Sequence, residues 1–123
     1  MNMETNKLKE VIKKWIINVD RTEELPSDIV ALCFNIYEPY GIEMVGSTWF
    51  DKDDEDWACD EDFEPTQRSC PDFEISDKLE WEEVLEIVVA ILKDLINELP
   101  DIKLLKVDHI AVGFTDGDLA IIK

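Results

Sequence analysis

Two stretches of the chain repeat apolar residues at the spacing of an amphipathic helix. Residues 5–19 place apolar side chains every three or four positions and lysines between them. The second stretch follows Asp77 and runs to about Leu99, where Pro100 stops it. Asp77 and Glu80 fit a capping box with Asp77 as the N-cap. We predict the main core helix here, with the apolar stripe Trp81, Val84, Leu85, Val88, Ile91, Leu92, Leu95, Ile96 and Leu99.

Two further segments have the composition of paired strands. Residues 29–37 are almost wholly apolar and rich in strand formers, which predicts a strand buried on both faces over part of its length. Residues 38–41 contain Pro and Gly, as a tight turn requires. Residues 42–50 then predict a second strand, antiparallel to the first.

The C-terminal region predicts a hairpin. Residues 109–115 and 118–122 flank Asp116-Gly117, a dipeptide that suits a two-residue type I′ turn. This register pairs Phe114 with Leu119 on one face, and Val112 with Ile121 on the same face. Residues 101–107 fit either a short helical turn or a connector.

The predicted order is α-β-β-α-β-β, an α+β domain with a mostly antiparallel sheet and helices packed against it. A length of 123 residues suits a single domain over residues 1–123, and 46% hydrophobic residues indicate a globular chain. The strand at 29–37 and the C-terminal strand could each lie at a sheet edge. Self-association through a strand edge therefore stays open.

A long acidic connection at about 51–74 interrupts the apolar pattern. Its first part, residues 51–64, reads DKDDEDWACDEDFE and holds nine acidic residues and one basic residue. Connections of this length are usually functional or disordered. Trp57 and Phe63 favour an ordered loop that these two rings anchor to the body, and Trp49 is expected to be a core residue of the preceding strand.

The charge distribution limits the kind of partner. The formal net charge is −18; residues 51–83 carry fifteen acidic and three basic groups, whereas residues 1–21 carry three acidic and five basic groups. Nucleic acid and anionic membranes are disfavoured, because both bind clustered Lys and Arg. A basic protein partner is favoured, with steered association that weakens as salt rises. No apolar run reaches membrane-spanning length and the first residues lack a signal core, so we expect a cytoplasmic protein.

Metal-binding patterns match poorly. Asp51, Asp53 and Glu55 alternate as in a calcium loop, but Asp56 stands where that loop needs Gly. The three cysteines and the single histidine have no zinc-site spacing; they are Cys33, Cys59, Cys70 and His109. We expect no metal site.

Catalytic and redox motifs match no better. A lone His109 without a nucleophile elbow, phosphate loop or dinucleotide fingerprint predicts a protein that is not an enzyme and has no cofactor. A Cys59–Cys70 disulfide is one reading of the cysteines, and free thiols are the favoured one.

Acidic residues mixed with aromatic ones predict a partner-binding surface rather than a solvating tail. The alternative is an acidic loop that only keeps the chain soluble. The residues we expect at the partner surface are Asp53, Asp54, Glu55, Asp56, Trp57, Asp60, Glu61 and Asp62.

Four segments together resemble small acidic immunity proteins of bacterial polymorphic-toxin systems: Trp49–Pro65, Arg68, the helix at 81–99 and IAVGFTDGDLAII at 110–122. The resemblance spans roughly residues 29–122. It implies a protein that neutralises a toxin encoded beside it by direct binding, without catalytic residues. A basic nuclease is one candidate toxin. The alternative function is an acidic nucleic-acid mimic that blocks a DNA-binding protein, for which carboxylates should extend along a whole face.

Overall fold

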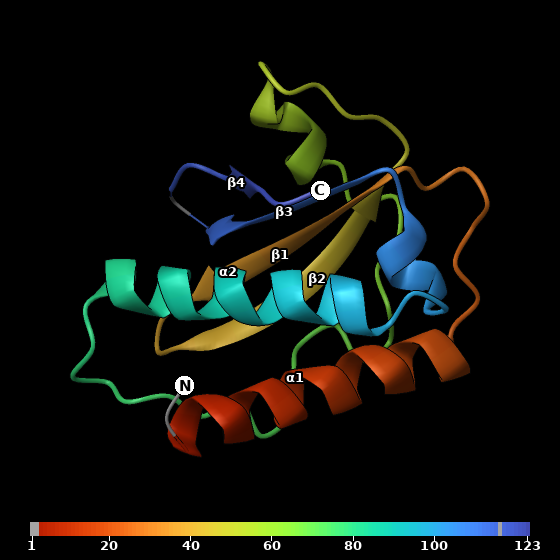
Figure 1. Ribbon diagram of the computed structural model, residues 1–123. Coiled ribbons are helices and arrows are strands. Elements are labelled where there is room, and N and C mark those ends of the chain that lie inside the picture. The colour runs from red at the N-terminus through yellow and green to blue at the C-terminus, as the bar shows by residue number, and fades with distance from the viewer. Residues whose placement is uncertain (1–2, 116) are drawn as a thin grey trace.

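The protein is an α+β domain with a single four-stranded sheet, as predicted. A computed structural model describes residues 3–115 and 117–123 (Figure 1). The chain order of elements matches the expected one, with two short 3-10 helices inserted. The elements are α1 (Met3–Thr22), β1 (Ala31–Tyr37), β2 (Gly41–Ser47), η1 (Glu55–Cys59), α2 (Trp81–Glu98), η2 (Lys103–Lys106), β3 (His109–Phe114) and β4 (Ala120–Ile121).

The sheet is mixed, with strand order β2-β1-β3-β4. The β1–β2 and β3–β4 pairs are antiparallel, and β1 and β3 run parallel. The strand predicted at 29–37 is thus central, and the expectation that it could be an edge is wrong. Four of its seven residues, Ala31 to Phe34, are buried in succession, because side chains on both faces are covered.

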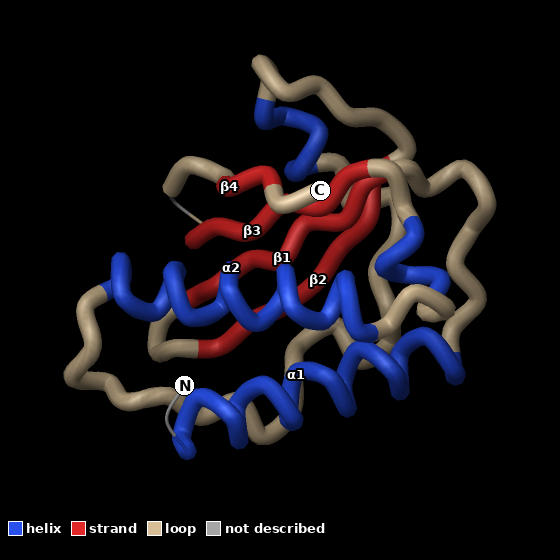
Figure 2. Tube along the Cα trace, in the orientation of Figure 1, coloured by secondary structure: helices blue, strands red, loops and turns tan. Residues whose placement is uncertain are grey.

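Two helices and the acidic connection cover opposite faces of the sheet. α1 and α2 lie side by side on one face, and η1 lies on the other (Figures 1 and 2). Leu32, Phe34 and Ile36 of β1 belong to the helix-side core. Ala31 and Cys33 alternate with them and belong to a smaller core beneath η1.

α1 is the predicted amphipathic helix and extends slightly beyond it at both ends. Its apolar stripe is buried, and the indole Nε1 of Trp15 donates to the carbonyl of Gln67 at 2.9 Å. Lys9 pairs with Glu98 of α2 at 2.7 Å. The basic N-terminal helix therefore packs on α2 and on the segment that follows residues 51–64.

α2 begins later than the sequence indicates. Its N-cap is Glu80, without a side-chain cap hydrogen bond, so the predicted capping box at Asp77 is wrong. Residues 76–79 form a turn in place of the predicted first helical turn. The N–H of Leu79 donates to the carbonyl of Ser76, and Tyr40 Oη donates to the carbonyl of Leu79 at 2.8 Å. Helix formation therefore starts only after Leu79.

The C-terminal strands pair in a register one residue away from the predicted one. Ala111 pairs with Ile121 and Val112 with Ala120. Leu119 consequently packs on the η1 side of the sheet, since a one-residue slip moves a side chain to the other face. A Cβ on Gly113 would lie 2.7 Å from the carbonyl oxygen of Asp118, so this close approach needs glycine. The predicted turn falls on Asp116, which lies outside the described residues.

No helix in the described part of the chain combines the length and apolar character needed to cross a membrane.

Candidate functional site

Residues 51–64 form an acidic platform that starts on the sheet face opposite the helices, at η1, and ends at the outer edge of β2, at Phe63. Trp57 of η1 is its anchor: the side chain is only 1% exposed and packs against Phe50, with ring centroids 5.1 Å apart. Phe50 in turn stacks on His109 at 3.8 Å. Phe63 is also buried. The prediction that Trp57 and Phe63 anchor the acidic loop is confirmed, and the single histidine packs within this aromatic stack.

Two carboxylates shape the platform locally. Asp51 Oδ1 accepts a hydrogen bond from the N–H of Asp53 at 2.8 Å, and Asp54 Oδ1 accepts from the N–H of Asp56 at 3.0 Å. Asp54 thereby caps η1. Short acidic side chains favour such turns because they satisfy the backbone two residues further on.

Other carboxylates tie the platform to residues that flank the strands, just after β2 and just before β4. Asp62 Oδ2 accepts from both the N–H and the Oγ1 of Thr48, each at 2.9 Å. These hydrogen bonds lower the pKa of Asp62 below its ordinary value. Glu55 Oε2 accepts from the N–H of Leu119 at 3.0 Å, which joins η1 to the C-terminal hairpin.

Trp49 lies just before the platform and packs against the smaller core without being fully buried. Its ring is only partly buried, and its Nε1 donates to Asp60 Oδ2 at 2.6 Å. β2 ends at Ser47, so Trp49 lies beyond the strand and the expectation of a buried strand residue is wrong.

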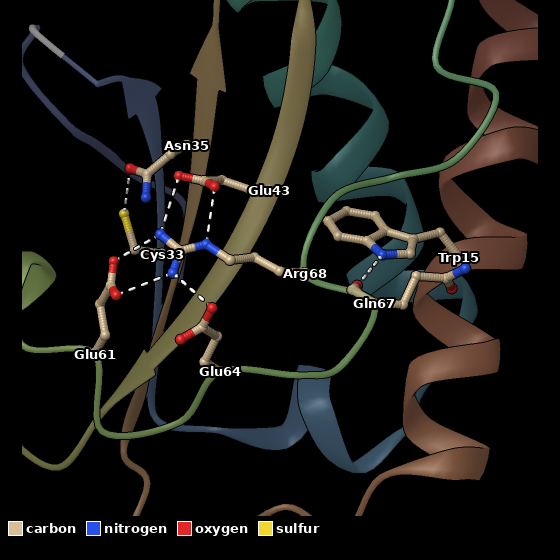
Figure 3. Close-up of polar contacts among 8 residues, drawn as sticks. All are labelled: Trp15, Cys33, Asn35, Glu43, Glu61, Glu64, Gln67 and Arg68. Atoms are coloured by element: carbon tan, nitrogen blue, oxygen red, sulfur yellow. Dashed lines mark hydrogen bonds and ion pairs between the residues drawn. The ribbon is translucent and has the colours of Figure 1, made fainter.

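Arg68 is the cationic centre beneath the platform (Figure 3). It contacts Glu43 of β2 at 2.9 Å, Glu61 at 2.6 Å and Glu64 at 3.1 Å. The hydrogen bonds to these carboxylates raise the pKa of Arg68, the Glu61 bond first, and the same bond lowers the pKa of Glu61. One guanidinium therefore offsets part of the repulsion among three carboxylates.

The segment at 63–70 closes the outer edge of β2. Gly46 and Phe63 exchange backbone hydrogen bonds at 2.8 and 3.0 Å, and Met44 N–H bonds to the carbonyl of Arg68 at 3.0 Å. This edge is not free for pairing with another chain, because the acidic connection already occupies its donors and acceptors. The other edge of the sheet is β4.

The platform brings together the residues expected to bind a partner, with one difference. Trp57 is buried, so its ring holds the platform and is not presented at the surface. The other seven are exposed. Within residues 3–115 and 117–123, Asp53 and Asp56 take part in side-chain hydrogen bonds only through their backbone N–H groups, and their carboxylates accept no hydrogen bond and form no ion pair. These two negative charges are therefore fully available at the surface.

The cysteines lie in different places. Cys59 is exposed on the platform, whereas Cys33 and Cys70 are buried, and none of the three is in a disulfide. Cys33 Sγ lies 3.2 Å from Asn35 Oδ1 (Figure 3). Burial raises the pKa of both Cys33 and Cys70 to about 12. Among the residues described, no group of three or more His, Cys, Asp or Glu side chains could hold a metal ion.

Comparison with known proteins gives this chain no relative. No family model matches it, and neither does any curated protein or solved structure. The resemblance to immunity proteins stays a prediction from the sequence pattern.

One exposed aromatic residue was misplaced by the sequence pattern. Trp81 fits the apolar stripe of α2 by spacing, but its side chain is 51% exposed. Its place as the first residue of α2, between Glu80 and Glu82, is the signal that could have separated it from the core residues. It packs edge-on against Phe114, with ring centroids 5.9 Å apart.

Proposed function

We propose that this protein is a non-catalytic binding protein that captures a basic protein on its acidic platform. In line with the immunity proteins it resembles, the partner is a toxin that the binding neutralises. The observation that carries the proposal is a pair of exposed, unpaired carboxylates, Asp53 and Asp56, on either side of a turn that the buried Trp57 holds in place.

The electrostatics of the platform support a cationic partner. Like charges at this density repel one another, and Arg68 offsets only the side of the platform that faces β2. Cations from a partner would relieve the remaining repulsion and would be drawn in from a distance at low salt.

The fixed geometry of the platform supports binding over mere solubility. A loop that only solvates the chain needs no defined shape. Hydrogen bonds fix the shape of the platform, and five of its carboxylates accept them: Asp51, Asp54, Glu55, Asp60 and Asp62. A surface that is ordered beforehand loses less conformational entropy when it binds.

The test compares capture by three immobilised proteins from a low-salt extract of the native host. The first is the wild type, and the second is a platform variant. The substitutions of the platform variant are Asp53→Asn, Asp54→Asn, Asp56→Asn and Asp60→Asn. Asparagine keeps the acceptor oxygens that cap η1 and bind Trp49, so the fold should persist.

The third protein is a charge-matched control that loses four exposed carboxylates on other segments. Its substitutions are Glu10→Gln, Glu24→Gln, Asp28→Asn and Asp101→Asn. We expect a basic protein that the wild type and the control retain and the platform variant loses. That protein should also arrest growth when expressed alone and permit growth when co-expressed with the wild type.

Two results would contradict the proposal. Equal retention of the basic protein by all three immobilised proteins would show that the binding surface lies outside the platform. Selective retention of a DNA-binding protein that does not arrest growth would favour the nucleic-acid mimic instead.

A further inference from the structure

A second candidate surface lies at one end of the sheet, where β1 and β3 finish and α2 begins (Figure 1). Because β1 and β3 are parallel, their last residues Tyr37 and Phe114 lie at the same end of the sheet. Trp81 reaches this end from the first turn of α2. An open cavity of about 540 Å³ lies here, which we name the aromatic notch; its lining residues are Tyr37, Glu38, Trp81, Phe114, Thr115 and Gly117.

Edge-to-face packing holds the Trp81 and Phe114 rings of the notch in place. Phe114 is the shared partner: Trp81 contacts it at an interplanar angle of 84°, and Tyr40 contacts it from the neighbouring turn at 68°. Trp81 nevertheless keeps about half of its surface exposed. An indole that is fixed on one side and open on the other presents a preformed π-surface to a ligand.

The charges around the notch are acidic. Glu38 lines it, and the exposed Glu80, Glu82 and Glu83 flank Trp81 in sequence. The pKa of Tyr40 is raised first by desolvation and then by repulsion from these same four carboxylates, so they gather at this corner. Neither lysine nor arginine occurs among the described lining residues. The carboxylates in the first turn of α2 also offset the positive end of the helix dipole.

We propose that the aromatic notch receives an arginine side chain of the basic partner, with its guanidinium on the Trp81 ring and paired with Glu38. Aromatic rings beside a carboxylate attract cations, and a planar, weakly hydrated guanidinium stacks on indole better than an ammonium group does. The proposal rests on the proposed function for the basic character of the partner. It adds a second contact region and the residue type that this region takes.

The notch can be tested with a short peptide and an indole signal. The four tryptophans give four indole N–H resonances in a ¹⁵N-labelled sample, and Trp81→Phe identifies that of Trp81. The probe is acetyl-Gly-Arg-Gly-amide, and its neutral isostere acetyl-Gly-citrulline-Gly-amide is the control peptide. We expect the arginine peptide to shift the Trp81 resonance saturably and the citrulline peptide to bind at least about fivefold more weakly.

Two variants test whether the shift of the Trp81 resonance arises from binding in the notch. Glu38→Gln should reduce the Trp81 shift at equal peptide concentration, and Glu24→Gln should not, because Glu24 does not line the notch. Both side chains are exposed, so neither change should alter the fold. The proposal is overturned if the Trp81 resonance does not move, if citrulline shifts it equally, or if Glu38→Gln has no effect.

This test can fail separately from the proposed function. The platform variant should show the same Trp81 shift as the wild type, since its substitutions lie outside the notch. A Trp81 shift together with unaltered capture by the platform variant would support the notch and contradict the platform. Loss of capture by the platform variant, together with no Trp81 shift in the wild type, would support the platform and contradict the notch.

Discussion

Arg68 and Glu43 form a two-point ion pair that joins β2 to the acidic platform. Arg68 Nε donates to Glu43 Oε2 at 2.9 Å, and Nη2 donates to Oε1 at 3.3 Å. The same guanidinium donates twice to Glu61, at 2.9 and 2.6 Å. Both side chains of the first pair are mostly shielded, with 25% and 18% exposure, so solvent screens this pair less than a surface pair.

Replacing Arg68 should therefore destabilise the fold. Arg68→Met keeps most of the apolar stem but leaves the carboxylates of Glu43 and Glu61 without their cation. We expect the free energy of unfolding to fall by about 1–3 kcal/mol, measured by urea denaturation.

Glu64→Gln is the matched control for that loss. Glu64 contacts the same guanidinium, but its side chain is 54% exposed, so its removal should cost less than about 0.5 kcal/mol. Equal effects of the two substitutions would mean that Arg68 does not organise the platform.

The contribution of Glu61 should disappear in acid. Its hydrogen bond to Arg68 lowers its pKa below the ordinary 4.5, so the folded state favours the charged form. A lowered pKa contributes stability that is complete above 4.5 and is lost as the pH falls through the lowered value. The difference in thermal midpoint between wild type and Glu61→Gln should be constant near neutral pH and vanish in this acidic range. A difference that persists at the lowest pH would assign the effect to packing.

The three thiols should differ sharply in reactivity. Cys59 is exposed, whereas Cys33 and Cys70 are buried with their pKa values raised to about 12. At pH 8 a thiol-specific reagent should modify one cysteine per molecule quickly and the other two only after unfolding. Cys59→Ser should abolish the fast phase. A fast phase that survives in this variant would show that one of the other two thiols is accessible.

Two glycines of the C-terminal hairpin should respond differently to alanine. A Cβ at Gly113 would meet the carbonyl oxygen of Asp118 at 2.7 Å, so Gly113→Ala should lower stability by about 1–3 kcal/mol. The nearest atom to a Cβ at Gly117 is Phe114 Cβ at 3.7 Å, and Gly117→Ala should stay within about 0.5 kcal/mol of the wild type. Chemical denaturation measures both, and equal effects would contradict the observed register of β3 and β4.

Local patterns in the sequence predicted much of the fold. The two helices and the antiparallel pair follow from periodicity and from the turn at 38–41, which depend on neighbouring residues. The parallel pairing of β1 with β3 depends on segments far apart in the chain. The start of α2 was missed for a similar reason, because the hydrogen bond from Tyr40 to Leu79 decides it.

The sequence also predicted part of the candidate site. Its charge and the anchoring role of Trp57 can be read from composition, since a large ring within an acidic run has few reasons to be exposed. The role of Arg68 under the platform depends on how distant elements pack, and spacing alone does not encode this. The exposure of Trp81 had a local signal, its place between two glutamates at the start of α2.

The association rate of the captured partner, measured by stopped flow over a range of salt concentrations, tests the central claim most directly. If the acidic platform steers a basic protein, the wild-type rate should fall steeply as salt rises. At low salt the platform variant should associate about tenfold more slowly than the charge-matched control, with little change in dissociation or in thermal midpoint. Equal low-salt rates for the two variants would contradict the claim, because they carry the same net charge and differ only in where it was removed.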